Sequence, residues 1–245
     1  MTYQPFFEFG TTRKSRWTVT SDHAANTVPT FVNGGDLGIS AADMNRHIAY
    51  DIGAAGVAQE LGALLDGPVI CSNFSRLVID PNRGSDDPTL LMKLYDGTII
   101  PANRHAGPDE LEQRMVACYR PYRSALDTLM KRRDNPVLLS IHSFTPQLKG
   151  RPWRPWEIGV LYAEDDRLAR ALLVHGGVAR LASLRPRSLR CPPARQPTTP
   201  FRAECGGLQE VIDLCAKHDI RPKIGQRPRN ARPLLPSAAL LVCTC

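Results

Sequence analysis

Two histidines at the ends of β-prone runs are the residues of this sequence best suited to metal chemistry. His23 lies with Asp22 and Asn26 just after one such run, and His142 follows the apolar run 138–141. Metal-assisted hydrolysis needs ligands on rigid elements and an open position for water. The pattern therefore predicts a metal site built on His23 and His142. The alternative for each is an ordinary hydrogen-bonded histidine of the core or surface.

A second polar cluster flanks the apolar run 77–79. Arg76 precedes this run, and Asp80, Asn82 and Arg83 follow it. Guanidinium groups match a carboxylate in shape and charge, so the cluster predicts a site for an acidic substrate. The alternative is a surface ion pair, which stabilises a protein by only about 0–1 kcal/mol.

His47 and Asp51 stand four residues apart in a run that is predicted to be helical, so they share one helix face. A solvated pair is the simpler interpretation. The alternative is a pair that does not bind the metal but orients one of its ligands through a hydrogen bond.

The apolar periodicity of the first 175 residues predicts alternating helices and strands. Ser40, with Asp43 three residues later, predicts the start of a long helix that continues to Leu65. A second helix is predicted over 109–133, kinked at Pro121. Short apolar runs predict strands at 68–71, 77–79, 137–141 and 158–162, and a further helix is predicted at 166–174. This order favours an α/β fold whose sheet is covered by helices.

The composition changes near residue 175. Residues 176–245 carry ten arginines and two lysines against four acidic residues, so their net charge is +8, and residues 1–175 carry −1 of the total of +7. Five of the seven cysteines also fall in this second segment, which is rich in proline and arginine and has a helical pattern only at 208–218. We therefore expect a folded domain at 1–175 and an atypical basic tail at 176–245.

The sequence has no recognisable targeting peptide and no apolar run long enough to span a membrane, so we expect a cytoplasmic protein. Its cysteines do not follow the CxxC spacing of a structural zinc site. The basic tail raises the alternative of a nucleic-acid-binding protein. That tail lacks interleaved aromatic residues and any nucleic-acid module, so nucleic acid is not the expected partner.

Six ordered motifs together resemble the N-formylglutamate amidohydrolase family. They extend from about Thr18 to Leu173 and read SDHAAN (21–26), RHIAYDIGAAGVAQEL (46–61), SRLVIDPNR (75–83), DGTIIPANR (96–104), LLSIHSFTPQLKGRPWRPWEIGVLY (138–162) and DDRLARALL (165–173). The resemblance implies a carboxypeptidase-like α/β fold, in which a mixed sheet is sandwiched between helices in three layers. It also implies metal-dependent hydrolysis of the amide of an N-acyl amino acid, foremost N-formyl-L-glutamate to formate and glutamate in histidine degradation.

The resemblance also assigns roles to the residues of the predicted metal site. His23 and His142 match the paired metal-binding histidines of the family, and the expected ion is divalent, with zinc foremost. Asn26 stands where carboxypeptidase relatives hold a glutamate ligand. Asp22 is the alternative source of a carboxylate, so the third ligand stays open.

The polar cluster around the run 77–79 matches the family motif that binds the substrate carboxylate. The residues carried over are Arg76, Asp80, Asn82 and Arg83. The partner that the resemblance implies is therefore a small N-acyl amino acid.

The resemblance ends near the change in composition, so the C-terminal part of the fold is expected to be atypical or incomplete. Family members continue with a strand that bears acidic residues, where a glutamate would serve as general base by analogy with carboxypeptidases. We find no such strand; Arg202-Ala203-Glu204 is only a superficial echo of it. A gene whose 3′ end is read out of frame or has recombined would encode such a change in composition near residue 175.

Two alternatives to a fully active amidohydrolase follow from this departure. One is a family member whose catalysis is impaired by the loss of its C-terminal glutamate. The other is a protein that binds acidic partners through its basic tail.

Overall fold

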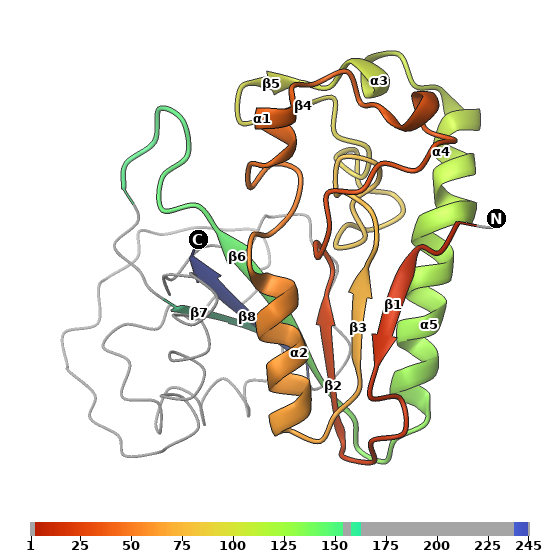
Figure 1. Cartoon of the computed structure of the whole chain (residues 1–245), viewed down its shortest axis with the longest axis vertical. Helices are drawn as coiled ribbons and strands as arrows, with labels where there is room; N and C mark the ends of the chain where they lie inside the picture. The colour runs from red at the N-terminus through yellow and green to blue at the C-terminus, as the bar shows by residue number, and fades with distance from the viewer. Residues whose placement is uncertain (1–2, 154–157, 163–237, 245) are drawn as a thin grey trace, which may run out of the picture.

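The computed structural model describes residues 3–153, 158–162 and 238–244 (Figure 1). These residues form a six-stranded mixed sheet with helices and a separate two-stranded hairpin. The α/β class predicted from the sequence is therefore confirmed. The closer likeness to zinc carboxypeptidases stays a prediction.

Parallel strands form the middle of the sheet. The order across the sheet is β1-β3-β2-β6-β8-β7, in which β3, β2, β6 and β8 run parallel and the edge strands β1 and β7 run antiparallel to their neighbours. The strands are β1 (Phe6–Phe9), β2 (Trp17–Ser21), β3 (Val69–Ser72), β6 (Val137–Phe144), β7 (Ile158–Tyr162) and β8 (Ala238–Thr244). The predicted strands at 68–71, 137–141 and 158–162 are confirmed.

Strand β8 lies inside the sheet, between β6 and β7, although it comes last in the described chain (Figure 1). It pairs in parallel with β6, from Leu138 opposite Ala238 to Phe144 opposite Thr244. No closing strand was expected after residue 175, so β8 corrects that expectation. The run Ala-Ala-Leu-Leu-Val suits a strand, but the proline and arginine residues before it obscure the pattern. The strand contains no acidic residue.

Helix α1 (Ala41–Met44) begins where the sequence predicts a helix. Ser40 Oγ accepts a hydrogen bond of 3.0 Å from the amide of Asp43, which caps the first turn. The helix ends after this single turn, so the predicted helix from 40 to 65 is interrupted.

Helix α2 (Ala54–Leu64) is the second part of that predicted helix. It starts after Gly53, whose backbone is left-handed with φ 77°. A left-handed residue interrupts a right-handed helix, and glycine adopts this conformation with little steric cost. The prediction of one long helix is therefore wrong, because residues 45–53 form turns and bends between two helices.

The second predicted helix, over 109–133, is confirmed with an irregular middle. Helix α4 (Pro108–Arg114) continues through the π-helical turn η2 (Met115–Tyr119) into α5 (Arg120–Lys131). Pro121 has no amide hydrogen to donate to the preceding turn, which accounts for the wider turn just before it.

The apolar run 77–79, which was predicted to be a strand, is a buried turn. Its three residues are fully buried but lie outside the sheet. Its carbonyl groups accept hydrogen bonds from side chains instead of from a neighbouring strand: Arg114 donates to Val78 O at 2.9 Å, and Asn103 donates to Leu77 O at 2.7 Å. The strand prediction is therefore wrong, and the turn rigidly positions the next residue, Asp80.

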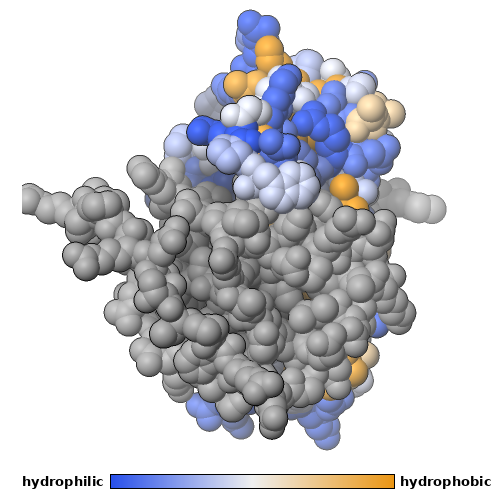
Figure 2. Space-filling view, turned by 90° about the vertical axis from the view of Figure 1, so that its left-hand side faces the viewer, coloured by the Kyte–Doolittle hydropathy of each residue, from blue (hydrophilic) through white to orange (hydrophobic). Residues whose placement is uncertain are grey.

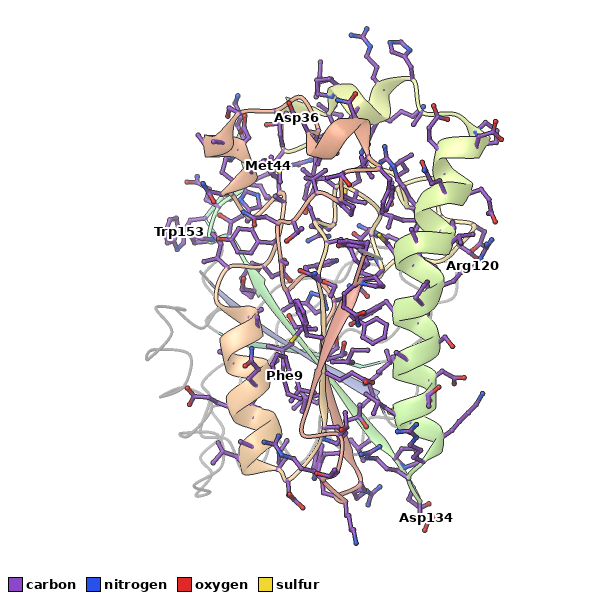
Figure 3. The ribbon with its side chains drawn as sticks, turned by 45° about the vertical axis from the view of Figure 1, so that its right-hand side comes forward. Phe9, Asp36, Met44, Arg120, Asp134 and Trp153 are labelled. Atoms are coloured by element: carbon purple, nitrogen blue, oxygen red, sulfur yellow. The ribbon has the colours of Figure 1, made fainter. Side chains whose placement is uncertain are left out.

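Helices α2 and α5 cover opposite faces of the sheet (Figure 3). On one face, Gly62 of α2 lies directly against Val69 of β3. On the other face, Tyr122 and Leu126 of α5 share the main apolar core with Ile70 of β3. Consecutive residues of a strand point to opposite faces, so the contacts of Val69 and Ile70 place the two helices on opposite sides.

A small cap of irregular structure covers one end of the sheet (Figure 1). Arg46, just after α1, fixes the hairpin by pairing with Asp96 at 2.9 Å. The described side chains of this end that Figure 2 shows are mainly hydrophilic. The remaining elements are η1 (Asn33–Gly35), α3 (Pro101–Arg104) and the hairpin of β4 (Leu94–Tyr95) and β5 (Thr98–Ile99).

Among the described helices, none is both long and apolar enough to cross a membrane. The helices predicted at 166–174 and 208–218 lie outside the described residues, and so does most of the predicted tail at 176–245.

Candidate metal centre

The candidate site forms where the parallel strands end. Asp22 and His23 follow β2, and His142 lies near the end of its neighbour β6. Asp80 follows the turn beyond β3, and Asp51 lies in the turns before α2. In α/β sheets, ligand sites form at the carboxyl ends of strands whose connections leave toward opposite faces. Here β2 leads to β3 through α2, and β3 leads to β6 through α5, so the site occupies such a position.

His23, Asp51 and His142 bring three ligand atoms together. Asp51 Oδ2 lies 2.7 Å from His142 Nδ1 and 3.2 Å from His23 Nδ1, and the two Nδ1 atoms are 3.1 Å apart. The three side chains are buried, with residue exposures of 1% for His23, 3% for Asp51 and 5% for His142. Within the described part of the chain, these residues form a group that could hold a metal ion.

Asp80 determines which nitrogen of His23 faces this group. Its Oδ1 lies 2.7 Å from His23 Nε2. Burial raises the pKa of Asp80, but the charges of His23 and Arg76 outweigh this effect and hold that pKa well below its usual range. An ionised carboxylate only accepts hydrogen bonds, so Nε2 carries the hydrogen. The lone pair of Nδ1 is thereby directed at Asp51 and His142.

Ser140 and Asp22 act on His142 from the side opposite the site. Ser140 Oγ donates to Asp22 Oδ2 at 3.1 Å and lies 3.1 Å from His142 Nε2. Because the hydroxyl hydrogen goes to Asp22, the serine oxygen accepts the hydrogen of His142 Nε2. The Nδ1 atom of His142 therefore faces the candidate site, as it does in His23.

These donor atoms fit a divalent metal ion. Two imidazole nitrogens and a carboxylate oxygen with lone pairs toward one point repel each other unless a proton or a cation lies between them. Tetrahedral zinc, with bonds of about 2.0–2.1 Å, separates its ligand atoms by about 3.3 Å, close to the 3.1 and 3.2 Å seen for two of the pairs here. Burial lowers the pKa of His142, but the hydrogen bonds and charges of Asp22 and Asp51 outweigh this effect and raise that pKa to about 9.

Arg76 connects two carboxylates of the site. Its Nη1 lies 3.4 Å from Asp51 Oδ1, and its Nη2 lies 3.1 Å from Asp80 Oδ2. The guanidinium also lies over the ring of Tyr95, 5.4 Å from the ring centre. Arg76 thus fixes the orientation of both carboxylates and offsets their negative charge.

Arg83 and Asn82 also lie next to the carboxylate of Asp80, and Arg83 lies farther from it than Arg76 does. The backbone amide of Asn82 donates to Asp80 Oδ1 at 2.9 Å. Arg83 Nε lies 3.6 Å from Asp80 Oδ2, and its Nη1 lies 4.0 Å from Asp87 Oδ2. Both distances exceed those of hydrogen bonds. The structure therefore brings all four residues of the predicted substrate cluster together around Asp80.

The other two predicted ligand residues, Asp22 and Asn26, have hydrogen-bond partners outside the group of His23, Asp51 and His142 Nδ1. Asp22 Oδ2 lies 3.4 Å from Nε2 of His142, on the far side of the ring from Nδ1. Asn26 Nδ2 donates to Met44 O at 2.9 Å and to Asn45 Oδ1 at 3.3 Å, so its amide nitrogen is held by the end of α1.

Asp51 is the site residue that the sequence analysis did not single out as a ligand. A solvated pair with His47 was the simpler interpretation, and it is wrong because Asp51 is buried. The amide of Asp51 donates to His23 O at 2.9 Å, while His47 Nε2 lies 3.4 Å from Asp96 Oδ2 instead. The sequence contained one signal against a continuous helix over 40–65. Gly53 lies inside that run, and a glycine can interrupt a helix.

Comparisons with known proteins identify the family of this chain and solved structures with a similar fold. The model of the N-formylglutamate amidohydrolase family matches residues 15–181. Among solved structures, a gene product from Agrobacterium tumefaciens is 26% identical, with a TM-score of 0.72 over 99% of this chain and 85% of its own. N-formylglutamate amidohydrolase from Ralstonia eutropha JMP134 is 18% identical and shares the fold, with a TM-score of 0.55 over 98% of this chain and 85% of its own. No curated protein sequence matches the chain significantly.

Proposed function

Because the chain belongs to the N-formylglutamate amidohydrolase family, we propose that it hydrolyses the amide of an N-acyl amino acid with the help of a bound metal ion. The proposed substrate is N-formyl-L-glutamate, and the products are formate and glutamate. Zinc is the proposed ion, because two imidazoles and one carboxylate with a position left for water form a common catalytic zinc site. The proposed setting is a cytoplasmic amidohydrolase of histidine degradation that acts on a small molecule.

The convergence of three ligand atoms supports the metal-dependent part of this proposal. Nδ1 of His23, Nδ1 of His142 and Oδ2 of Asp51 would hold the ion. Asp51 takes the third position in this proposal, in place of Asp22 or Asn26. When bound, the metal ion supplies Lewis-acid polarisation of the amide carbonyl and lowers the pKa of a water molecule.

The substrate-binding part of the proposal assigns different roles to the two arginines. Among the described residues, the guanidinium of Arg83 forms only long ion pairs, so we propose that it makes a two-point contact with a substrate carboxylate. Asn82 would support this contact from the adjacent position. Arg76 is already held by Asp51 and Asp80, and its proposed role is to keep these carboxylates in place.

A family member that binds metal but turns over slowly is the second candidate. Strand β8 contains no acidic residue, so this strand of the described sheet supplies no glutamate to act as general base. Loss of a general base typically slows a reaction by about 10²–10⁴-fold. The metal site would persist in such a protein, because none of its three proposed ligands lies on β8.

Formate release from N-formyl-L-glutamate, measured after treatment with a chelator and again after addition of zinc, tests the proposal. We expect zinc to restore formate release in the wild-type protein but not in His142→Ala. His105→Ala is the matched control, since His105 is exposed at the end of α3, and it should behave like wild type. Equal rates in wild type and His142→Ala would refute the assignment. Zinc binding with very slow formate release would favour the second candidate.

A further inference from the structure

A column of buried polar side chains stands behind His142. Thr20 and Ser140 are direct partners in the parallel pairing of β2 with β6. Side chains two residues apart on a strand share a face, so His142 continues this column on β6, and Asp22, just after β2, joins it by accepting a hydrogen bond of 3.2 Å from Thr20. Tyr122 of α5 covers the same face and contacts Thr20 and Asp22. The column thus joins two strands and a helix next to the candidate metal centre.

Asp22 is the acceptor at the centre of this column. Its Oδ1 accepts hydrogen bonds from Tyr122 at 2.6 Å and from Thr20 at 3.2 Å. Its Oδ2 accepts from Ser140 at 3.1 Å and lies 3.4 Å from His142 Nε2. Both carboxylate oxygens are therefore engaged by the protein, and both lie on the side of His142 that faces away from His23 and Asp51.

The hydrogen bonds of the column have one consistent direction. Ser140 gives its hydroxyl hydrogen to Asp22, so it can only accept from His142 Nε2. This arrangement keeps a hydrogen on Nε2 and leaves Nδ1 as the nitrogen that faces Asp51 at 2.7 Å. Without the carboxylate, the hydroxyl of Ser140 could instead donate to Nε2, and the imidazole hydrogen could move to Nδ1, where it would block a metal ion.

We propose that Asp22 is a positioning residue of the metal centre, which acts through Ser140 and His142 to present the lone pair of His142 Nδ1, while Tyr122 holds the carboxylate of Asp22 in place. This inference rests on the proposed metal site. It gives Asp22 a role other than that of a ligand. It also means that α5, which carries no proposed ligand, contributes to the metal centre through Tyr122.

The electrostatics of the column agree with this role. Burial and the charge of Asp22 raise the pKa of Tyr122 well above its ordinary value, so this phenol remains a hydrogen-bond donor. Outer partners of metal-binding histidines typically contribute about 10- to 100-fold to metal affinity.

Zinc affinity, measured by competition with a chromophoric chelator, tests the proposal without relying on turnover. We expect Asp22→Asn to weaken zinc binding about 10- to 100-fold. Tyr122→Phe should weaken it to a smaller extent, because the carboxylate loses its 2.6 Å donor while the ring keeps its edge contact with Phe74. Asp127→Asn is the matched control, since Asp127 is on the exposed side of the same helix and pairs with Lys131.

A second measurement separates positioning from a purely structural role. Thermal unfolding of the metal-free proteins reports on the fold alone, whereas the d–d absorption of bound cobalt(II) reports on the geometry around the ion. A positioning role predicts that Asp22→Asn changes the cobalt spectrum and the zinc affinity of a protein that is still folded. A lower unfolding temperature with unchanged zinc affinity would overturn the proposal.

The remaining outcomes are also decisive. If Asp22→Asn does not fold, Tyr122→Phe takes its place, and unchanged zinc affinity in that variant overturns the proposal. If the wild-type protein binds no zinc, the proposed function and this inference fail together. If wild type and Asp22→Asn bind zinc equally well, only the inference about Asp22 fails.

Discussion

Each histidine of the candidate metal centre has an acidic partner on the side that faces away from the site. His23 has Asp80 at 2.7 Å, and His142 has Asp22 at 3.4 Å with Ser140 between them in the hydrogen-bond path. These partners determine which nitrogen carries a hydrogen, so they determine which nitrogen can bind a metal ion. The chemistry of the site thus depends on residues that need not touch the ion.

Arg83→Lys tests the proposed substrate contact. Lysine keeps the positive charge but loses the two-pronged shape, so we expect KM for N-formyl-L-glutamate to rise by about tenfold or more with little change in kcat. Arg120→Lys is the control, since Arg120 pairs with Glu112 through both prongs on the exposed side of the helix. An unchanged KM in Arg83→Lys would contradict the assignment.

His47, which is not a proposed ligand, provides a pH-dependent prediction. Burial lowers its pKa, and Arg46 and Arg76 lower it further against the opposing charges of Asp96 and Asp51. A depressed pKa in the folded state means that the unfolded state takes up the proton first. The contribution of His47 to stability is therefore present above about pH 6.5 and is lost as the pH falls below it.

We expect His47→Gln to remove this pH-dependent term. Between pH 7.5 and 5, the free energy of unfolding in urea should fall less in His47→Gln than in the wild-type protein. The comparison uses the slope with pH, so a uniform change in stability caused by the substitution cancels. A steeper loss in the variant would contradict the expected sign.

The histidines of the site were predictable from the sequence, whereas Asp51 was not predicted as a ligand. His23 and His142 stand at the ends of β-prone runs, and strand ends form a shared edge. Asp51 stands in a run whose apolar spacing fits a helix, and on a helix it would have faced solvent with His47. In the structure Asp51 lies in the turns between α1 and α2, where its amide donates to His23 O at 2.9 Å, and the apolar spacing of the sequence does not show that the helix is interrupted there.

At the scale of elements, turns rather than strands carry the acidic residues of the candidate site. Asp51 lies in the turns before α2, and Asp80 follows the buried turn after β3. Periodicity correctly predicts α5 and β6, because each has one repeating face over many residues. It fails at the run 77–79, where the apolar side chains are buried but the carbonyl groups bind Arg114 and Asn103 instead of a strand.

Gly62→Ala tests the close packing of α2 on the sheet. A Cβ atom at Gly62 would lie 2.1 Å from Val69 Cγ2 and 3.1 Å from Gly67 O. Alanine favours a helix over glycine by about 1 kcal/mol, but overpacking costs about 1–3 kcal/mol, so we expect a net loss of about 1–2 kcal/mol. Urea unfolding would measure it.

Leu64→Ala is the control for this packing prediction, because Leu64 is 58% exposed on the same helix. It should change the free energy of unfolding by no more than about 0.5 kcal/mol. A Gly62→Ala variant more stable than wild type would show that the helix can move away from β3 without loss.

At the scale of the whole molecule, one sheet joins segments on both sides of the change in composition. The family model matches residues 15–181, and β8 at 238–244 lies beyond this match but pairs with β6 inside the same sheet. Composition and charge place a boundary near residue 175, yet they carry no information about strand pairing. Pairing depends on backbone geometry, which is why the sequence did not predict β8.

Two buried cysteines report on unfolding of the whole molecule. Cys71 on β3 and Cys118 in η2 are free and buried, and burial raises the pKa of each thiol to about 12. At pH 8 the reactive thiolate is therefore scarce, and the reagent has no direct access. We expect iodoacetamide to modify both residues in urea but neither in the folded protein, as measured by peptide mass spectrometry. Fast modification of either residue without urea would contradict this burial.

The position of β8 between β6 and β7 also has a consequence for synthesis of the chain. Tyr162, which ends β7, and Ala238, which begins β8, are 76 positions apart. At about 5–20 residues per second, a ribosome needs about 4–15 s to translate this interval. During that time β6 and β7 are already made, but the strand that joins them is not. The pairs of β8 with β6 and with β7 can therefore form only after this interval has been translated.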